Sequence, residues 1–119
     1  MRKYLILFLI FIICFISYGW TKAGWKEDNL KGKVKQRTRV DYNFEKKFGE
    51  VVKTIKEKYI SKYDAKGNMI EEARYNSDGN LDYKYISKYD AKGNMIEEAG
   101  YNNIEEPINF TEYQYEYYQ

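Results

Sequence analysis

The sequence predicts an all-β protein, an antiparallel meander of repeated β-hairpins with about six strands, after an N-terminal signal peptide. Three observations favour this fold class. The 15-residue stretch YISKYDAKGNMIEEA occurs twice, letter for letter, at residues 59–73 and 85–99. Turn-forming segments that end in Gly-Asn separate stretches in which polar and apolar residues alternate. Twelve of the 14 tyrosines follow residue 19, and tyrosine favours strands.

Residues 1–19 have the organisation of a secretory signal peptide. Arg2 and Lys3 form a positively charged start, residues 5–16 are an unbroken apolar run, and the small residue Gly19 precedes the expected cleavage point. A permanent transmembrane helix needs about 20 apolar residues, more than this run contains. We therefore expect export to the periplasm, the cell envelope or the medium, with an uncleaved membrane anchor as the alternative.

Removal of the signal peptide would leave residues 20–31 as an N-terminal linker and residues 32–119 as one β-sheet domain. Cys14 follows Ile13 within the apolar run, so it does not fit the lipobox of a lipoprotein. The exported chain would contain no cysteine, and no disulfide could stabilise it. Its basic and acidic residues would be equal in number, at 18 each.

This charge balance and the missing residue types argue against several classes of function. A formal charge of zero gives no general attraction to nucleic acid, or to membranes except through the signal segment if it stays uncleaved. The chain contains no histidine, which excludes His-based acid–base catalysis, Ser-His-Asp triads and the usual zinc sites. We predict no enzymatic activity, no cofactor and no metal.

The duplicated stretch belongs to two longer repeat units, residues 58–76 and 84–102, which differ only at Arg74 and Gly100. Each unit contains Tyr-Asp-Ala-Lys-Gly-Asn, and a related turn lies between them at residues 76–80. An Asp or Asn followed three residues later by Gly is typical of a three-residue hairpin loop, in which a type I turn is closed by a left-handed glycine bulge. Each unit is therefore predicted to be one strand, one turn and one return strand.

If Asp64 pairs with Asn68 across the first turn, one face of the sheet becomes rich in tyrosine, methionine, leucine and alanine. The other face becomes rich in lysine, glutamate and isoleucine. Cross-strand pairs of these kinds stabilise a sheet by about 0.2–1 kcal/mol each. The expected pairs are Tyr63–Met69, Tyr59–Ala73, Lys62–Ile70, Ile60–Glu72, Tyr75–Leu81, Ala73–Tyr83, Arg74–Asp82, Glu72–Lys84, Ile70–Ile86, Tyr89–Met95, Tyr85–Ala99 and Tyr83–Tyr101.

The remaining strands are predicted from alternation on either side of the repeats. Residues 33–40 alternate cleanly, and residues 45–49 form a turn. Residues 50–64 return as a long strand, and residues 108–118 form the last strand. A helix over residues 46–58 is the alternative, because four apolar residues there share a helical face.

Three groups of charged residues raise the possibility of a binding or catalytic site. The basic side chains of residues 33–39 could bind polyanions, although a solvated strand face explains them as well. The Asp and Asn residues of the turns could hold calcium, but turn chemistry accounts for all of them. The pairs Glu71-Glu72 and Glu97-Glu98 could supply two carboxylates for glycoside hydrolysis, but neighbours on a strand point to opposite faces.

The tyrosine-rich face is the candidate ligand or partner surface. Its rings could stack on sugars, or they could form the hydrophobic core, since the chain has little else to bury. The partners expected for it are a cell-surface glycan, or another protein paired through an open sheet edge. The candidate residues are Tyr59, Tyr63, Tyr83, Tyr85, Tyr89, Tyr101, Tyr113 and Tyr115.

The Tyr-Asp-Ala-Lys-Gly-Asn segments at residues 63–68 and 89–94 resemble the YD repeats of the RHS family. Residues 29–119 as a whole are similar to small exported RHS-repeat-like proteins of Bacteroidota. In large RHS proteins, such repeats build a spiralling β-sheet shell around a passenger, and short ones are often labelled sugar-binding. This chain has two full motifs, too few to close a shell, and we expect no toxin domain after them.

The resemblance and the residues together predict a non-enzymatic exported module that binds a ligand or another protein. The alternatives are a carbohydrate-binding module with an exposed tyrosine face, and a structural or truncated fragment without a ligand. The tyrosine-rich end, residues 112–119, looks like the strand before a further turn, so the last strand either continues in a longer chain or pairs with a partner.

Overall fold

The computed structural model describes residues 24–119, so the predicted signal peptide and the start of the predicted linker lie outside the described residues. The fold is all-β, as predicted. Six antiparallel strands form one open sheet in the order of the sequence. The strands are β1 (Gln36–Lys47), β2 (Glu50–Tyr63), β3 (Met69–Tyr75), β4 (Leu81–Tyr89), β5 (Met95–Tyr101) and β6 (Pro107–Glu112). Among the described residues, no helix has the length and hydrophobicity needed to cross a membrane.

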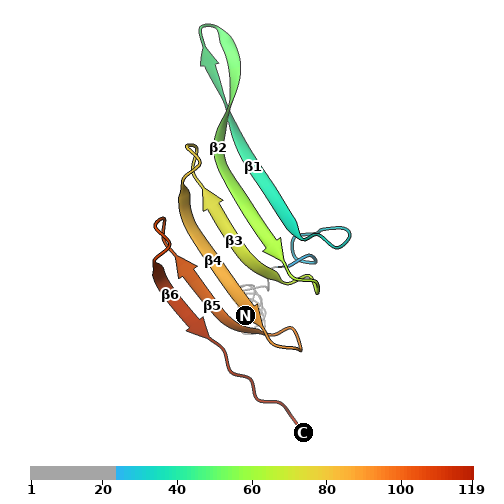
Figure 1. Cartoon of the computed structure of the whole chain (residues 1–119). Coiled ribbons are helices and arrows are strands. Elements are labelled where there is room, and N and C mark those ends of the chain that lie inside the picture. Colours follow the sequence, from blue (N-terminus) through green and yellow to red (C-terminus); the bar gives the residue numbers. More distant parts are fainter. Residues whose placement is uncertain (1–23) are drawn as a thin grey trace, which may run out of the picture.

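The sheet is a single layer, and each strand packs only against its neighbours in sequence (Figure 1). A single layer has no second layer to bury its faces, so few side chains are withdrawn from water. The buried apolar side chains of the described chain are Tyr63, Met69 and Ala73. The small core therefore lies at the hairpin formed by β2 and β3.

The turns have the predicted geometry. Asp64 Oδ1 accepts hydrogen bonds from the backbone N–H of Lys66 and of Asn68, both at 2.9 Å. Gly67 closes the loop at φ 87°, in the left-handed region that favours glycine. The turns that begin at Asn76 and Asp90 repeat these bonds.

A fourth turn of the same kind joins β5 to β6, and its chemistry was not predicted. Asn102 Oδ1 accepts hydrogen bonds from the backbone N–H of Ile104 and of Glu106. Glu105 takes the left-handed position of the glycine, at φ 60°. The signal available in the sequence was the leading asparagine, and the missing glycine concealed the turn.

Beside each turn the register is as predicted: the pairs are Tyr63–Met69, Tyr75–Leu81 and Tyr89–Met95. One step further along, each returning strand contains a residue without a cross-strand partner, which is a β-bulge. The bulged residues are Ile70, Asp82, Ile96 and Ile108. A further bulge lies at Lys56 in β2, since Asp41 pairs with Glu57 and Tyr42 with Ile55.

The predicted pairs beyond these bulges are wrong by one residue, because each extra residue shifts the pairing. Lys62 lies opposite Glu71 instead of Ile70, and Tyr85 lies opposite Gly100 instead of Ala99. The expected Arg74–Asp82 contact survives as an ion pair at 3.7 Å, although the two residues are not cross-strand partners. The other corrected pairs are Tyr59–Arg74, Ile60–Ala73, Ala73–Lys84, Arg74–Tyr83, Glu72–Tyr85, Glu71–Ile86 and Lys84–Tyr101.

A shift of one residue exchanges side chains between the two faces of the sheet. The tyrosine face consists of Arg37, Arg39, Tyr59, Ser61, Tyr63, Met69, Glu72, Arg74, Tyr83, Tyr85, Ser87, Tyr89, Met95, Glu98, Gly100, Asn109 and Thr111. The isoleucine face includes Gln36, Thr38, Val40, Lys58, Ile60, Lys62, Glu71, Ala73, Tyr75, Leu81, Lys84, Ile86, Lys88, Glu97, Ala99, Tyr101, Pro107, Phe110 and Glu112. The alanines predicted for the tyrosine face therefore lie with the isoleucines, and charged residues replace them beside the tyrosines.

The outer strands differ in length from the prediction. Strand β1 begins at Gln36 and continues to Lys47, so the turn is confined to Phe48 and Gly49. Strand β2 agrees with the predicted long strand to within one residue, and the helical alternative over residues 46–58 is wrong. Strand β6 ends at Glu112, whereas the last strand was predicted to reach residue 118.

The start of the described chain packs against the first repeat turn. The Trp25 backbone N–H donates to the Gly67 carbonyl at 2.9 Å, and its indole Nε1 donates to the Val34 carbonyl at 2.7 Å. The Tyr63 hydroxyl donates to Asp28, which also pairs with Arg37 at 3.4 Å. This N-terminal segment explains why the buried residues gather at the first hairpin.

Candidate functional site: a groove on the tyrosine face

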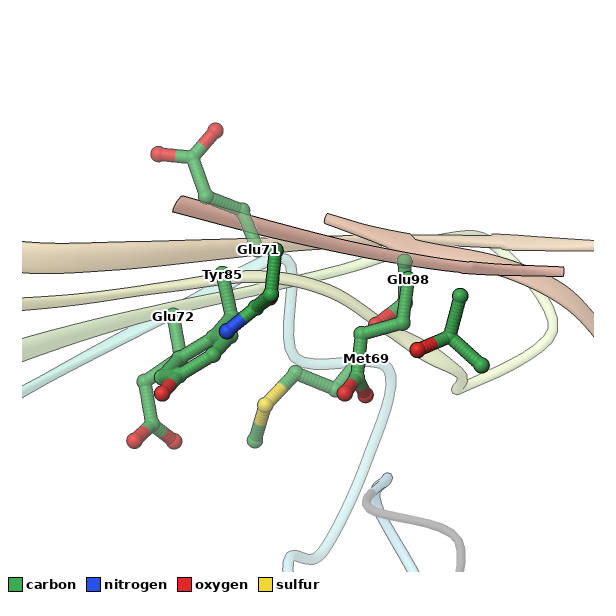
Figure 2. A pocket seen from close by; sticks show the side chains of 8 residues that line it. Met69, Glu71, Glu72, Tyr85 and Glu98 are labelled. Carbon is green, nitrogen blue, oxygen red and sulfur yellow. The ribbon is translucent and has the colours of Figure 1, made fainter. Parts of the chain in front are cut away.

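A hollow of about 490 Å³ lies on the tyrosine face over the middle of the sheet. Strands β3, β4, β5 and β6 all contribute to it, because the meander brings them side by side (Figure 1). Figure 2 shows Met69, Glu72, Tyr85 and Glu98 extending to the same side of the sheet. The lining residues are Met69, Glu71, Glu72, Tyr85, Ser87, Glu98, Asn109 and Thr111.

Tyr85 is the aromatic residue of this groove, and 37% of its surface is exposed. Its ring meets that of Tyr83 edge to face, with centroids 5.4 Å apart. Tyr59 occupies the equivalent position of the first repeat, but two cations cover it. The Arg39 guanidinium lies 4.2 Å from its ring centroid and that of Arg74 lies 6.0 Å away. The tyrosine at this repeat position is therefore accessible in the second copy, as Tyr85, and covered in the first copy, as Tyr59.

The single difference between the repeat units helps to leave Tyr85 open. Arg74, opposite Tyr59, is held by Glu57 through hydrogen bonds of 2.5 and 2.9 Å. That hydrogen bond is the main reason why the pKa of Glu57 is lowered. The equivalent residue opposite Tyr85 is Gly100, which has no side chain. A Cβ at Gly100 would lie 2.5 Å from Asn109 Oδ1, so the amide of Asn109 lies directly over this glycine.

Two carboxylates lie on either side of Tyr85 in the sheet. Glu72 is its cross-strand partner on β3, and Glu98 lies on β5 opposite Ser87. Within residues 24–119, no ion pair engages either of them, whereas Glu71 and Glu97 on the isoleucine face pair with Lys62 and Lys88. Figure 2 shows the Glu71 carboxylate pointing away from the groove. The groove thus offers two uncompensated acceptors beside an exposed ring.

The eight predicted tyrosines do not form one surface. Tyr63 is buried, and its pKa is raised to about 12, first by burial and then by its bond to Asp28. Tyr101 lies on the isoleucine face opposite Lys84. The positions of the others are as follows: Tyr59, Tyr83, Tyr85 and Tyr89 on the tyrosine face, and Tyr113 and Tyr115 after β6.

Tyrosines 89 and 115 make equivalent contacts one repeat apart. The Tyr89 hydroxyl donates to the Met69 carbonyl at 2.7 Å, and the Tyr115 hydroxyl donates to the Met95 carbonyl at 2.5 Å. Burial raises the pKa of Tyr89 and of Tyr83. Strand β6 and the residues after it therefore follow the geometry of a third repeat.

A second hollow, of about 760 Å³, lies on the isoleucine face between the two repeat turns. Ile70, Ile86 and Ile96 line it, together with residues of both turns. Lys66 bridges these turns, since its Nζ donates to the Ala91 carbonyl at 3.2 Å. Aliphatic and charged residues line this hollow in equal number, and its one aromatic residue, Tyr89, is half-buried, unlike the exposed Tyr85 of the tyrosine face.

Several of the charged residues considered from the sequence have partners within residues 24–119 of the fold, in contrast to Glu72 and Glu98. Arg37 pairs with Asp28, and Arg39 pairs with Asp41 at 3.3 Å while covering Tyr59. Asp64, Asn76 and Asp90, the first residues of the three glycine turns, accept hydrogen bonds from the backbone of their own turns. In the part of the chain that the structure describes, no three His, Cys, Asp or Glu side chains gather in a way that could hold a metal ion.

Sequence reasoning considered Glu72 and Glu98 only as carboxylate pairs with Glu71 and Glu97, and it missed three other polar residues of the groove: Ser87, Asn109 and Thr111. The two glutamates were placed on the other face because the bulges were not foreseen. Asn109 and Thr111 were expected in a strand but not beside the repeats. No signal in the sequence located them, since their position depends on the pairing of β5 with β6.

Comparisons with family models, with curated proteins and with solved structures gave no match to this chain. The resemblance to YD repeats therefore remains a prediction from the sequence.

Proposed function

We propose that this chain is a non-enzymatic, exported binding module of the YD-repeat type, and that its ligand is a glycan bound in the groove at Tyr85. One observation carries the proposal: the exposed ring of Tyr85 lies among hydrogen-bonding side chains in a hollow of the sheet. Aromatic rings bind the apolar faces of sugars, and a few convergent polar groups then fix the orientation.

The residues around Tyr85 suit the hydroxyl groups of a sugar. Glu72 and Glu98 accept hydrogen bonds, while Asn109, Ser87 and Thr111 can both donate and accept. The two carboxylates have no compensating cation among the described residues, so an acidic sugar would be repelled. We therefore expect neutral or amino sugars to bind in preference to uronic or sialic acids.

A glycan array probed with the exported protein tests this proposal. Binding to neutral or amino sugars should disappear with Tyr85→Ala, because the stacking platform is lost. Tyr59→Ala is the matched control, since Tyr59 occupies the same repeat position but is covered by Arg39 and Arg74. Circular dichroism verifies that both variants fold. If no sugar on the array binds, or if binding persists in Tyr85→Ala, the glycan hypothesis is wrong.

Gly100→Arg provides a second test at the same site. It makes the second repeat unit identical to the first and places a long side chain opposite Tyr85. A Cβ at this position already meets Asn109, so the groove should close. Sugar binding should fall with Gly100→Arg but should survive the reverse change Arg74→Gly.

Binding of another protein through the edge of β6 is a second candidate function. Ile108 and Phe110 of this edge strand are 57% and 58% exposed. An exposed, apolar edge strand is a template for a further strand. Sedimentation at increasing concentration should then detect association, and Phe110→Lys should reduce it. If the protein stays monomeric and binds no glycan, the remaining interpretation is a structural or truncated fragment without a ligand.

A further inference from the structure

The hairpin of β1 and β2 projects beyond the rest of the sheet as an outer ribbon, residues 42–55 (Figure 1). Strand β3 pairs with β2 only from Lys58 onward, so among residues 24–119 the outer ribbon has two strands and no third. The bulge at Lys56 marks the point where the ribbon begins. A two-stranded ribbon buries little of its own surface. Its side chains are therefore available to a partner on both sides.

The two faces of the outer ribbon have opposite characters. One face presents Tyr42, Phe44, Lys46, Val51, Lys53 and Ile55, and the other presents Asn43, Glu45, Lys47, Glu50, Val52 and Thr54. The first face is apolar and cationic, and it contains no carboxylate. Phe44 is 72% exposed and Val51 is 64% exposed. Lys53 lies 3.9 Å above the ring of Tyr42, so its charge accompanies the aromatic surface.

The tip of the ribbon contains an apolar residue in an unfavourable conformation. Phe48 has φ 53° and Gly49 has φ 81°, and the side chain of Phe48 is fully exposed. Two-residue turns of this type favour Asn or Gly at the first position, because a bulky side chain is strained at positive φ. A strained phenylalanine that contacts solvent brings no benefit to the isolated fold, and such outliers point to function.

We propose that the outer ribbon docks onto an anionic lipid surface, with Phe48, Phe44 and Val51 entering the interface. Apolar and aromatic side chains at a projecting tip, with lysines on the same face, have the distribution of elements that lie in membrane interfaces. Lys46 and Lys53 would meet the negative headgroups. The exported chain has a formal charge of zero, so the attraction to negative headgroups comes from the lysines of the ribbon and not from the net charge of the protein. The charge of this face favours a lipid surface over a mixed protein surface.

A spin label at the tip tests the proposal in a way that is independent of the N-terminal segment. Phe48→Cys carries the label in a chain with Cys14→Ser, and Ser77→Cys, in the turn between β3 and β4, is the matched control. On vesicles of phosphatidylcholine with 30% phosphatidylglycerol, label 48 should lose collisions with a water-soluble relaxation agent. Label 77 should stay accessible, and neither label should change on pure phosphatidylcholine. Equal accessibility of both labels on the anionic vesicles overturns the proposal.

Substitutions separate a lipid-binding role from a structural one. Phe48→Asn suits the left-handed turn, so it should raise the thermal midpoint while weakening vesicle binding. K46Q together with K53Q should weaken binding to anionic vesicles roughly twenty-five-fold, about fivefold for each lysine. If Phe48→Asn binds vesicles as well as the native chain, the tip does not insert and the proposal fails. Protection of label 48 that depends on protein concentration instead of lipid would identify a second copy as the partner.

Discussion

The two identical copies, residues 59–73 and 85–99, form the same hairpin but differ in what covers them. In the first copy the buried residues are Ser61, Tyr63, Gly67, Asn68, Met69 and Ala73. In the second copy none of the equivalent six residues is buried. The backbone hydrogen bonds of the two turns agree to within 0.1 Å. Local structure is therefore the same in both copies, while burial is not.

The difference comes from the segments at the two ends of the described chain. Trp25 packs on the first turn, and Asp28 receives the hydroxyl of Tyr63. The second turn is covered less closely, by Tyr117, which is 52% exposed and accepts a hydrogen bond from Asn94 at 2.9 Å. The first copy thereby becomes the core, and the second copy keeps a surface on which a ligand can bind.

Gly67→Ala should be the most destabilising change, at about 4 kcal/mol of unfolding free energy. The new Cβ would lie 2.4 Å from the Trp25 ring, and the residue would also be strained at φ 87°. Gly79→Ala is the control, because Gly79 has φ 84° with no atom near the added Cβ. It should cost only about 1–2 kcal/mol for the strain. Equal losses in urea denaturation would show that Trp25 does not cover the first turn.

Trp25→Ala should cost about 2–3 kcal/mol, because a half-buried aromatic side chain and its hydrogen bond to Val34 are lost. Tyr117→Ala, at the second turn, should cost less than 1 kcal/mol, roughly the value of one exposed hydrogen bond. In the Trp25→Ala background, Gly67→Ala should cost no more than Gly79→Ala. If the double-mutant cycle shows no coupling between Trp25→Ala and Gly67→Ala, the two residues are not in contact.

Tyr63→Phe should cost about 2 kcal/mol, since it removes a partly buried hydrogen bond to the carboxylate of Asp28. Tyr89→Phe, the same substitution in the second copy, removes a bond to the neutral Met69 carbonyl and should cost about 1 kcal/mol. Denaturant titration of the two variants measures the difference. The reverse order would mean that Asp28 contributes little to the first hairpin.

The Tyr63 hydroxyl should also contribute to the pH dependence of the stability of the fold. The folded-state pKa of Tyr63 is about 12, above the ordinary value of 10.0, so folding favours the protonated form. This contribution is complete below pH 10 and is lost as the pH rises through about 12. Thermal midpoints should therefore fall more steeply over this range in the native chain than in Tyr63→Phe. Parallel curves for the two proteins would exclude an unusual pKa.

Glu105→Gly should have the smallest effect, a gain of about 0.5–1 kcal/mol. It relieves the left-handed strain at φ 60° and gives the fourth turn the glycine of the other three. Glu105 is 66% exposed in its ion pair with Lys84, so the loss of this pair should matter little. Gly79→Glu is the reciprocal control and should destabilise. A loss of stability in Glu105→Gly would show that the turn is held by that ion pair.

The sequence predicted much of the fold because its turns are chemically explicit. Asp or Asn at the first position and Gly at the fourth located three turns, and the strands between them followed. Only part of the candidate site could be predicted in this way. Tyr85 was among the candidates, but Glu72 and Glu98 were assigned to the wrong face. The bulges at Ile70 and Ile96 depend on how neighbouring strands twist together, and a single strand does not specify them.

The sequence by itself determined that this chain is a meander of repeated hairpins, because turn formation and strand propensity depend on residues close in the chain. Only the tertiary structure decided which copy is buried and which tyrosine is open. Residues 59–73 and 85–99 are identical, so no property of the stretch itself could distinguish them. Their difference arises from contacts with Trp25, Asp28 and Arg74 in the first copy, and from Gly100 in the second. Burial is a property of neighbours in space, and the same hairpin can therefore serve as core in one place and as surface in another.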